Sequence, residues 1–254
     1  MVLASLFASG AVTLGLFIVM LLLIEVGHRL RLRSGRMGAD VPGSTAMESA
    51  IFAIFGLLLA FTFSGAMARY DAHRQLIVQE ANDIGTAYLR LDLLPAQART
   101  ELRQSFREYT VVRARSSEVA GSAANARETA RLQGAIWSAA VVGAARDDAN
   151  KDASKLLLPA LNDMIDMTST RSNAFAMHPP GVVSFLLVTL ACIAALLAGF
   201  GMAGERRSWL HSIVFAATIA LTIYTALDIE YPRHGLVTLA SRDRVFTDLL
   251  ESMK

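Results

Sequence analysis

The stretch "ARYDAHRQLIVQEANDIGTAYLRLD", residues 68–92, decides the fold because it follows an apolar segment without any helix-stop signal at the junction. No glycine or proline lies between Arg69 and Ile84, and the next proline is Pro95. Gly and Pro are the residues that most often interrupt a helix. The sequence therefore predicts one helix from about Glu48 to Leu94, roughly 70 Å long, of which about 30 Å would lie in lipid.

Beyond the apolar segment, the predicted helix keeps an apolar stripe with a period of 3.5 residues. The stripe consists of Tyr70, Ile77, Ala81, Ile84, Tyr88 and Leu91. Such a stripe has to be buried, either against the helices predicted over residues 97–177 or against copies from other subunits. Gly85 interrupts the run, and we expect it to mark a close helix contact or a bend.

The composition indicates a membrane protein. Hydrophobic residues make up 54% of the 254 residues, and the mean hydropathy is +0.42, whereas soluble domains contain about 45–50% apolar residues. A helical span needs about 20 mostly apolar residues. Four stretches qualify: residues 3–26, 49–68, 181–203 and 209–227. The first stretch has the alternative reading of a cleaved signal peptide, but its length and the arginines after it favour a retained helix.

The polar region between the second and third spans shows helical periodicity throughout. Amphipathic stretches cover residues 97–119, 125–148 and 152–177, and "SRDRVFTDLLESM" near the C-terminus reads as a short helix. We predict an all-α membrane protein with four spans in two pairs. Its expected parts are a first pair (1–69), a helical extramembrane region continuous with span two (70–178), a second pair (179–229) and a C-terminal extramembrane helix (230–254).

The orientation follows from the arginines that flank the spans. Two short loops carry Arg29, Arg31, Arg33, Arg36, Arg206 and Arg207. Short loops rich in Lys and Arg face the cytoplasm, so the helical region and the C-terminus are expected on the non-cytoplasmic side. The net charge of +2 gives no support to nucleic-acid binding, because basic residues are mixed with acidic residues outside the loops that flank the spans.

Four segments together resemble the bacterial bestrophin-like domain family. They are "GLLLAFTFSGAMARYDAHRQLIVQEANDIGTAYLRLDLLP" (56–95), "LLLPALNDMIDMTSTR" (156–171), "LLAGFGMAG" (196–204) and "LDIEYPRHGLV" (227–237). Bestrophins are pentameric anion channels in which a helix from each subunit lines the pore and an apolar neck narrows it. The resemblance thus implies a homo-oligomer, a pentamer, that conducts chloride across the bacterial inner (plasma) membrane. Two features depart from bestrophins: the acidic calcium-clasp pattern has no match, and the charges place the helical region outside the cytoplasm.

The second span offers two sets of candidate residues. Gly56, Ala60 and Ser64 recur every four residues, a pattern that lets membrane helices approach closely. Phe55, Leu59 and Phe63 lie on another face. In a bestrophin-like assembly this second set would form a hydrophobic constriction that gates by dewetting. The alternative is that these side chains face lipid or neighbouring helices.

Charged residues near the span ends form a second set of candidates: Arg69, Asp228, Glu230 and Arg233. One interpretation is a helix-end cluster in which the acids pair with Arg69 or Arg74. The other is an acidic ring at a pore mouth. Glu25 and His28 end the first span, where an interfacial ion pair with the arginine cluster is expected.

The sequence does not support catalysis. On the helix after span two, His73 and Glu80 share a face, with Asp83 one turn on. A metal site needs three or four converging ligands, so a solvated or subunit-contacting face is the favoured interpretation. Phosphate loops, nucleophile elbows and Cys–His sets have no match. We therefore expect no enzyme activity, no metal and no cofactor. Besides the channel, the remaining hypothesis is a non-conducting sensor or scaffold whose helical region binds a protein partner.

Overall fold

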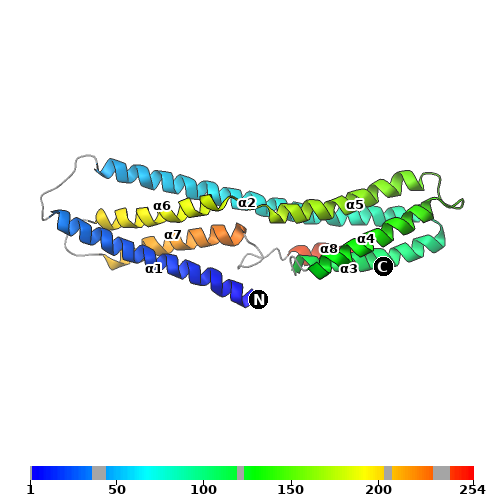
Figure 1. Ribbon diagram of the computed structural model, residues 1–254, viewed down its shortest axis with the longest axis horizontal. Helices are drawn as coiled ribbons and strands as arrows, with labels where there is room; N and C mark the ends of the chain where they lie inside the picture. Colours follow the sequence, from blue (N-terminus) through cyan, green and yellow to red (C-terminus); the bar gives the residue numbers. More distant parts are fainter. Residues whose placement is uncertain (1, 36–43, 119–122, 203–207, 231–240) are drawn as a thin grey trace. The chain divides into compact units, whose positions relative to one another are not determined.

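The computed structural model describes residues 2–35, 44–118, 123–202, 208–230 and 241–254, and in these ranges every regular element is helical. The helices are labelled in Figure 1. They are α1 (Val2–Gly35), α2 (Ser44–Arg90), the 3-10 turn η1 (Leu91–Leu93), α3 (Ala96–Glu118), α4 (Ala123–Ala144), α5 (Ala153–Ala176), α6 (Gly181–Phe200), α7 (Trp209–Glu230) and α8 (Ser241–Ser252). The long helix predicted from about Glu48 to Leu94 is observed as α2, which begins at Ser44 and ends at Arg90, where η1 follows directly.

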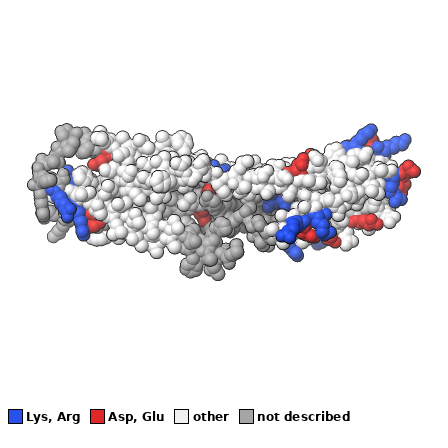
Figure 2. Space-filling view, viewed as in Figure 1, with Lys and Arg blue, Asp and Glu red and all other residues white. Residues whose placement is uncertain are grey.

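The chain divides into two compact units. Unit 1 consists of Met1–Tyr70 and His178–Thr238, and unit 2 consists of Asp71–Met177 and Leu239–Lys254. Four helical stretches are long and apolar enough to cross a membrane: Gly10–Arg33, Ala46–Leu93, Ala153–Phe200 and Trp209–Glu230. The all-helical, four-span prediction is confirmed. On the face shown in Figure 2, few charged side chains lie over the middle of unit 1, whereas both signs of charge are spread over α3, α4 and α5.

Small residues let α1 and α6 pack closely in unit 1. Fully buried alanines of α6 (Ala191, Ala194, Ala195) face Met20 and Ile24 of α1 in one hydrophobic cluster. A Cβ on Gly27 would overlap the carbonyl oxygen of Leu196, and a Cβ on Gly199 would overlap that of Ile24. Backbone is therefore in contact with backbone at this crossing, which is the geometry that small residues permit in membrane helices.

The apolar stripe is buried within unit 2 from Ile77 of α2 to Leu91 of η1, whereas Tyr70 belongs to unit 1 and is half-buried. Ile84 and Leu91 are fully buried, and Ile77, Ala81 and Tyr88 nearly so. The Tyr88 hydroxyl donates to the Met253 carbonyl over 2.8 Å. A Cβ on Gly85 would lie 3.3 Å from Leu249 Cδ1, so this glycine marks a close contact with α8. Of the two predicted ways of burying the stripe, contact within the same chain is the one observed.

We predict that Gly27→Ala destabilises unit 1, because the new methyl group overlaps a backbone carbonyl that no side-chain rotation can move. Overpacking of this kind costs about 1–3 kcal/mol. The thermal unfolding midpoint of the purified protein in detergent measures the effect. Gly15→Ala in the same helix is the matched control, because a Cβ at Gly15 meets nothing within 4 Å. Equal midpoints for the two variants would contradict the close crossing.

Candidate functional site

The membrane part of α2 lies at the edge of the unit 1 core. Between Ala46 and Ala68 only Phe55 and Ala66 are buried. Phe55 packs in the cluster formed by α1, α6 and α7, where the neighbouring Phe52 meets Phe215 edge-on at 6.3 Å between ring centroids. Most of this apolar helix therefore has no partner within its own described subunit.

The structure separates the three residues predicted to form one constriction. Phe55 is 5% exposed and belongs to the core, whereas Phe63 is 38% exposed. Leu59 is half-buried. At about 100° per residue, Leu59 and Phe63 lie between the buried edge and the face of small residues. Phe55 is thus unavailable to line a conduit in this conformation, because packing inside the subunit takes up its ring.

The predicted helix-packing residues occupy one exposed face. Gly56, Ala60 and Ser64 are all exposed, and a Cβ on Gly56 would meet no other atom within 4 Å. Their small side chains therefore make no close helix contact inside the described subunit. The face formed by Phe63, Gly56, Ala60 and Ser64 is called the open face of α2 below.

Charged candidates of unit 1 meet where α2 passes the end of α7. The Arg69 Nε lies 2.9 Å from both carboxylate oxygens of Glu230, and its Nη2 lies 2.5 Å from Oε2. His178 Nδ1 lies 3.6 Å from Oε1 of the same carboxylate. Asp228 is buried on α7, and Arg233 lies outside the described residues. Glu230 is thus held within its own subunit and does not project freely as a ring of acids would require.

Glu25 forms an ion pair at the other end of the membrane helices. The Arg29 Nε donates to Glu25 Oε1 over 2.6 Å, one turn apart on α1, and both side chains reach the surface. This is the kind of interfacial pair that the sequence predicts. His28 is buried beside them.

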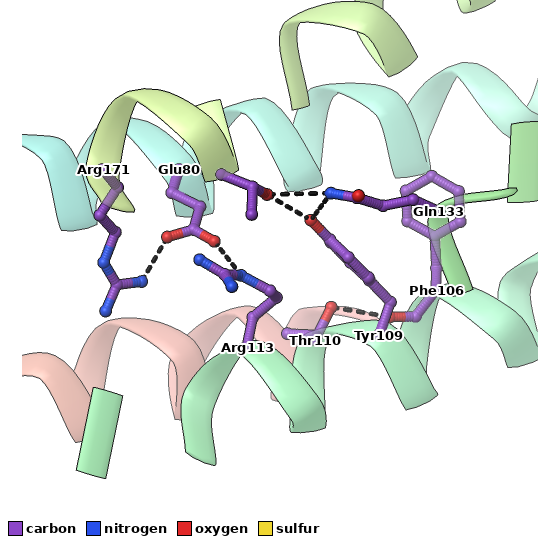
Figure 3. A network of polar contacts seen from close by, with 8 residues as sticks. Glu80, Phe106, Tyr109, Thr110, Arg113, Gln133 and Arg171 are labelled. Atoms are coloured by element: carbon purple, nitrogen blue, oxygen red, sulfur yellow. Dashed lines mark hydrogen bonds and ion pairs between the residues drawn. The ribbon is translucent and has the colours of Figure 1, made fainter. Parts of the chain in front are cut away.

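In unit 2, one buried carboxylate joins three helices (Figure 3). Glu80 of α2 has a fully buried side chain, with Arg113 of α3 2.5 Å from Oε1 and Arg171 of α5 bonded to Oε2. The side chains of Arg113 and Arg171 are only 9% and 5% exposed. Arg171 also stacks over the rings of Phe175 and Phe246. Two buried cations on one anion leave the cluster with a net positive charge.

A neutral network lies next to this cluster. The Tyr109 hydroxyl is 3.0 Å from Thr168 Oγ1, and the Gln133 amide donates to both oxygens. Burial raises the pKa of Tyr109 above its usual value, so the phenol stays protonated at neutral pH. The network therefore adds hydrogen bonds between α3, α4 and α5 without adding charge.

Glu80 was predicted to lie on a solvated or subunit-contacting face, whereas its side chain is fully buried, and its two arginine partners were not predicted. Both arginines nevertheless continue apolar helix faces. Arg113 follows Phe106 by seven residues, and Arg171 follows Met164 by seven, a spacing that places such residues on one face.

His73 stacks on Phe175 at 4.2 Å between ring centroids. In the part of the chain that the structure describes, no group of three or more His, Cys, Asp or Glu side chains is arranged to hold a metal ion.

Replacing Glu80 by Gln should strongly destabilise unit 2, because Arg113 and Arg171 would remain buried without a counter-charge. Breaking a buried ion pair from one side costs about 3–5 kcal/mol. Chemical denaturation followed by circular dichroism measures the loss. The matched control is Glu128→Gln, whose partner Arg131 is exposed, and it should leave the unfolding midpoint unchanged. A midpoint for Glu80→Gln equal to that of the control would contradict the clamp.

Comparison with known proteins gives the same architecture. The family model for the bestrophin-like domain matches residues 14–241. A crystal structure of a bacterial bestrophin homolog from Klebsiella pneumoniae carrying a point mutation superposes with a TM-score of 0.75 and 14% identity, covering 94% of this chain and 98% of that chain. Another crystal structure of the Klebsiella pneumoniae homolog, phased with zinc, gives a TM-score of 0.73 at the same identity and coverage. None of the curated proteins matches the sequence.

Proposed function

The chain belongs to the bestrophin-like domain family, and on that premise we propose that it forms a homo-oligomeric anion channel in which α2 lines the pore. The observation that carries the proposal is the open face of α2. A membrane helix whose small and apolar side chains find no partner in their own subunit has to meet lipid, another subunit or an aqueous path. The likeness to the Klebsiella pneumoniae homolog supports the fold on which such a path would be built.

Oligomerisation gives the open face two distinct roles. Gly56, Ala60 and Ser64 permit the close approach of a helix from a neighbouring subunit. Phe63 and Leu59, beside them, would then face the axis and form the hydrophobic constriction. Phe55 is left out of this constriction, because its ring belongs to the subunit core. The family resemblance makes a pentamer the expected assembly.

Purified protein in planar bilayers should carry unitary anion currents, and Phe63→Ala should change them because it widens the constriction. We expect a change in conductance on the order of twofold or more, since a narrow apolar neck limits ion flow by dewetting. The single-channel conductance in symmetric chloride measures it.

The matched control is Phe185→Ala on α6, which removes an equally large ring from a membrane helix. Phe185 is 71% exposed and lies on another helix, so its loss should leave conductance as it is. Bilayers that stay sealed under all ion gradients would contradict the channel. Equal effects of the two substitutions would contradict the pore-lining role of α2.

A non-conducting sensor or scaffold is the second candidate function, and one observation favours it. On α4 of unit 2, Trp137, Val141 and Val142 are 37%, 40% and 68% exposed. Exposed apolar side chains that lie together can mark a surface for a protein partner. Under this function, a specific protein would purify with the wild type and be lost from a Trp137→Ser/Val142→Ser variant, while bilayer recordings would stay silent.

We propose that unit 2 lies on the non-cytoplasmic side of the inner membrane. Arginines are concentrated between spans one and two and between spans three and four, and such arginines favour the cytoplasm. Cys192 is the only cysteine, so a Cys192→Ala background allows single-cysteine labelling. Lys151→Cys in unit 2 should react with a membrane-impermeant maleimide in intact spheroplasts. Met47→Cys, at the start of α2, should react only after permeabilisation. The reverse pattern would overturn the orientation.

A further inference from the structure

A small cavity in unit 1 contains the pair formed by Arg69 and Glu230. Its volume is about 180 Å³, and α2, the first turn of α6 and the last turn of α7 form its walls. Since a water molecule takes about 30 Å³ of liquid volume, the cavity has room for several waters or for a small ion. Apart from the charged pair and the hydroxyls of Thr62 and Ser184, aliphatic and aromatic side chains line the space.

We propose that Arg69 and the first turn of α6 form a binding site for a small inorganic anion, and that the carboxylate of Glu230 occupies this site as a built-in anion. Glu230 is held by Nε and Nη2 of the guanidinium. A guanidinium binds carboxylates and inorganic anions through the same fork of N–H donors. The carboxylate thus stands where a free anion would bind.

The start of α6 adds to the positive potential of the cavity. The helix begins at Gly181 and follows Pro180, which has no side-chain group able to cap the first amides. Val183 and Ser184 of this turn line the cavity. The N-terminal end of a helix carries a partial positive charge that favours anions. The Ser184 hydroxyl is a further donor at the same wall.

The Arg69 side chain is partly exposed and uses only two of its three nitrogens to hold Glu230. Its side chain is 34% exposed, whereas that of Glu230 is 6% exposed. Gly65 lies one turn before Arg69, and a Cβ there would stand 3.3 Å from Nη1. Among the residues that the structure describes, Nη1 has no hydrogen-bond acceptor. The guanidinium thus contacts its own carboxylate through Nε and Nη2 and packs over Gly65, and Nη1 is left as an unused donor on a partly exposed side chain.

Removing the charge of Glu230 should therefore recruit an anion from solution. Glu230→Gln keeps the shape of the side chain but leaves Arg69 uncompensated in a largely apolar cavity, which is unfavourable for a charged group. An inorganic anion restores the balance. The inference rests on the proposed channel function only for the kind of ion involved, an anion. Binding of the anion is measured without any current, so it is tested independently of conduction.

The test uses the full-length protein in detergent and sodium bromide as the probe, with sodium gluconate keeping the ionic strength constant. A ligand that binds only the folded state raises the unfolding midpoint with its concentration. Bromide should bind Glu230→Gln roughly tenfold or more tightly than the wild type, because the charged hydrogen bonds of Arg69 become available. The double variant Arg69→Gln/Glu230→Gln should lose this response, and anomalous scattering should place bromide in the cavity.

Each outcome has a defined meaning. Equal bromide responses in Glu230→Gln and the double variant overturn the site, whether or not the protein conducts. Bromide bound at Arg69 without any bilayer current supports the site and contradicts the channel. Should Glu230→Gln fail to give monodisperse protein, Glu230→Asp replaces it, because its shorter side chain draws the carboxylate away from Arg69. Glu230→Asp must then bind bromide more tightly than the wild type, and equal binding overturns the inference.

Discussion

One helix, α2, has an apolar part suited to lipid and an amphipathic part suited to water. The rest of the structure depends on how the apolar side chains of each part are covered. Over residues 46–68 it carries apolar and small side chains, of which only two are buried in its own subunit. From Ile77 to Tyr88 it buries an apolar stripe within unit 2, and Leu91 of η1 continues this stripe. The change in burial follows from the hydrophobic effect, which requires apolar side chains to be covered in water but not in lipid.

Charge reinforces this division at two places along α2. Arg69 holds Glu230 in unit 1, and Glu80 holds Arg113 and Arg171 in unit 2. A buried charge is tolerated when it is paired and hydrogen-bonded, so each pair fixes which helices stand next to α2. The difference between them is accessibility. The cluster around Glu80 is closed, whereas the Arg69 side chain is one-third exposed and lines a cavity. The proposed exchange of a carboxylate for another anion therefore applies to Arg69 and not to the Glu80 cluster.

Much of the fold could be predicted from the sequence, because its signals are local. Hydropathy located the spans, and the absence of Gly and Pro predicted the continuous α2. The helices expected over 97–119, 125–148 and 152–177 are observed as α3, α4 and α5. The site was harder, because burial depends on which helices meet. Helical periodicity alone assigned Phe55 and Phe63 to the same face of α2. In the structure, Phe55 is buried by packing against α1, α6 and α7, whereas Phe63 is exposed. Arg113 and Arg171 look like ordinary surface residues until Glu80 is placed between them.

The most direct test is cryo-electron microscopy of the protein in lipid nanodiscs. It determines the symmetry of the assembly and the radius of any pore along the symmetry axis. A channel built on α2 should be a fivefold assembly with a continuous axial path. In it, Leu59 and Phe63 of α2 form the narrowest apolar ring, and neighbouring copies cover Gly56 and Ala60. A monomer, or a twofold dimer without a continuous path, would contradict it.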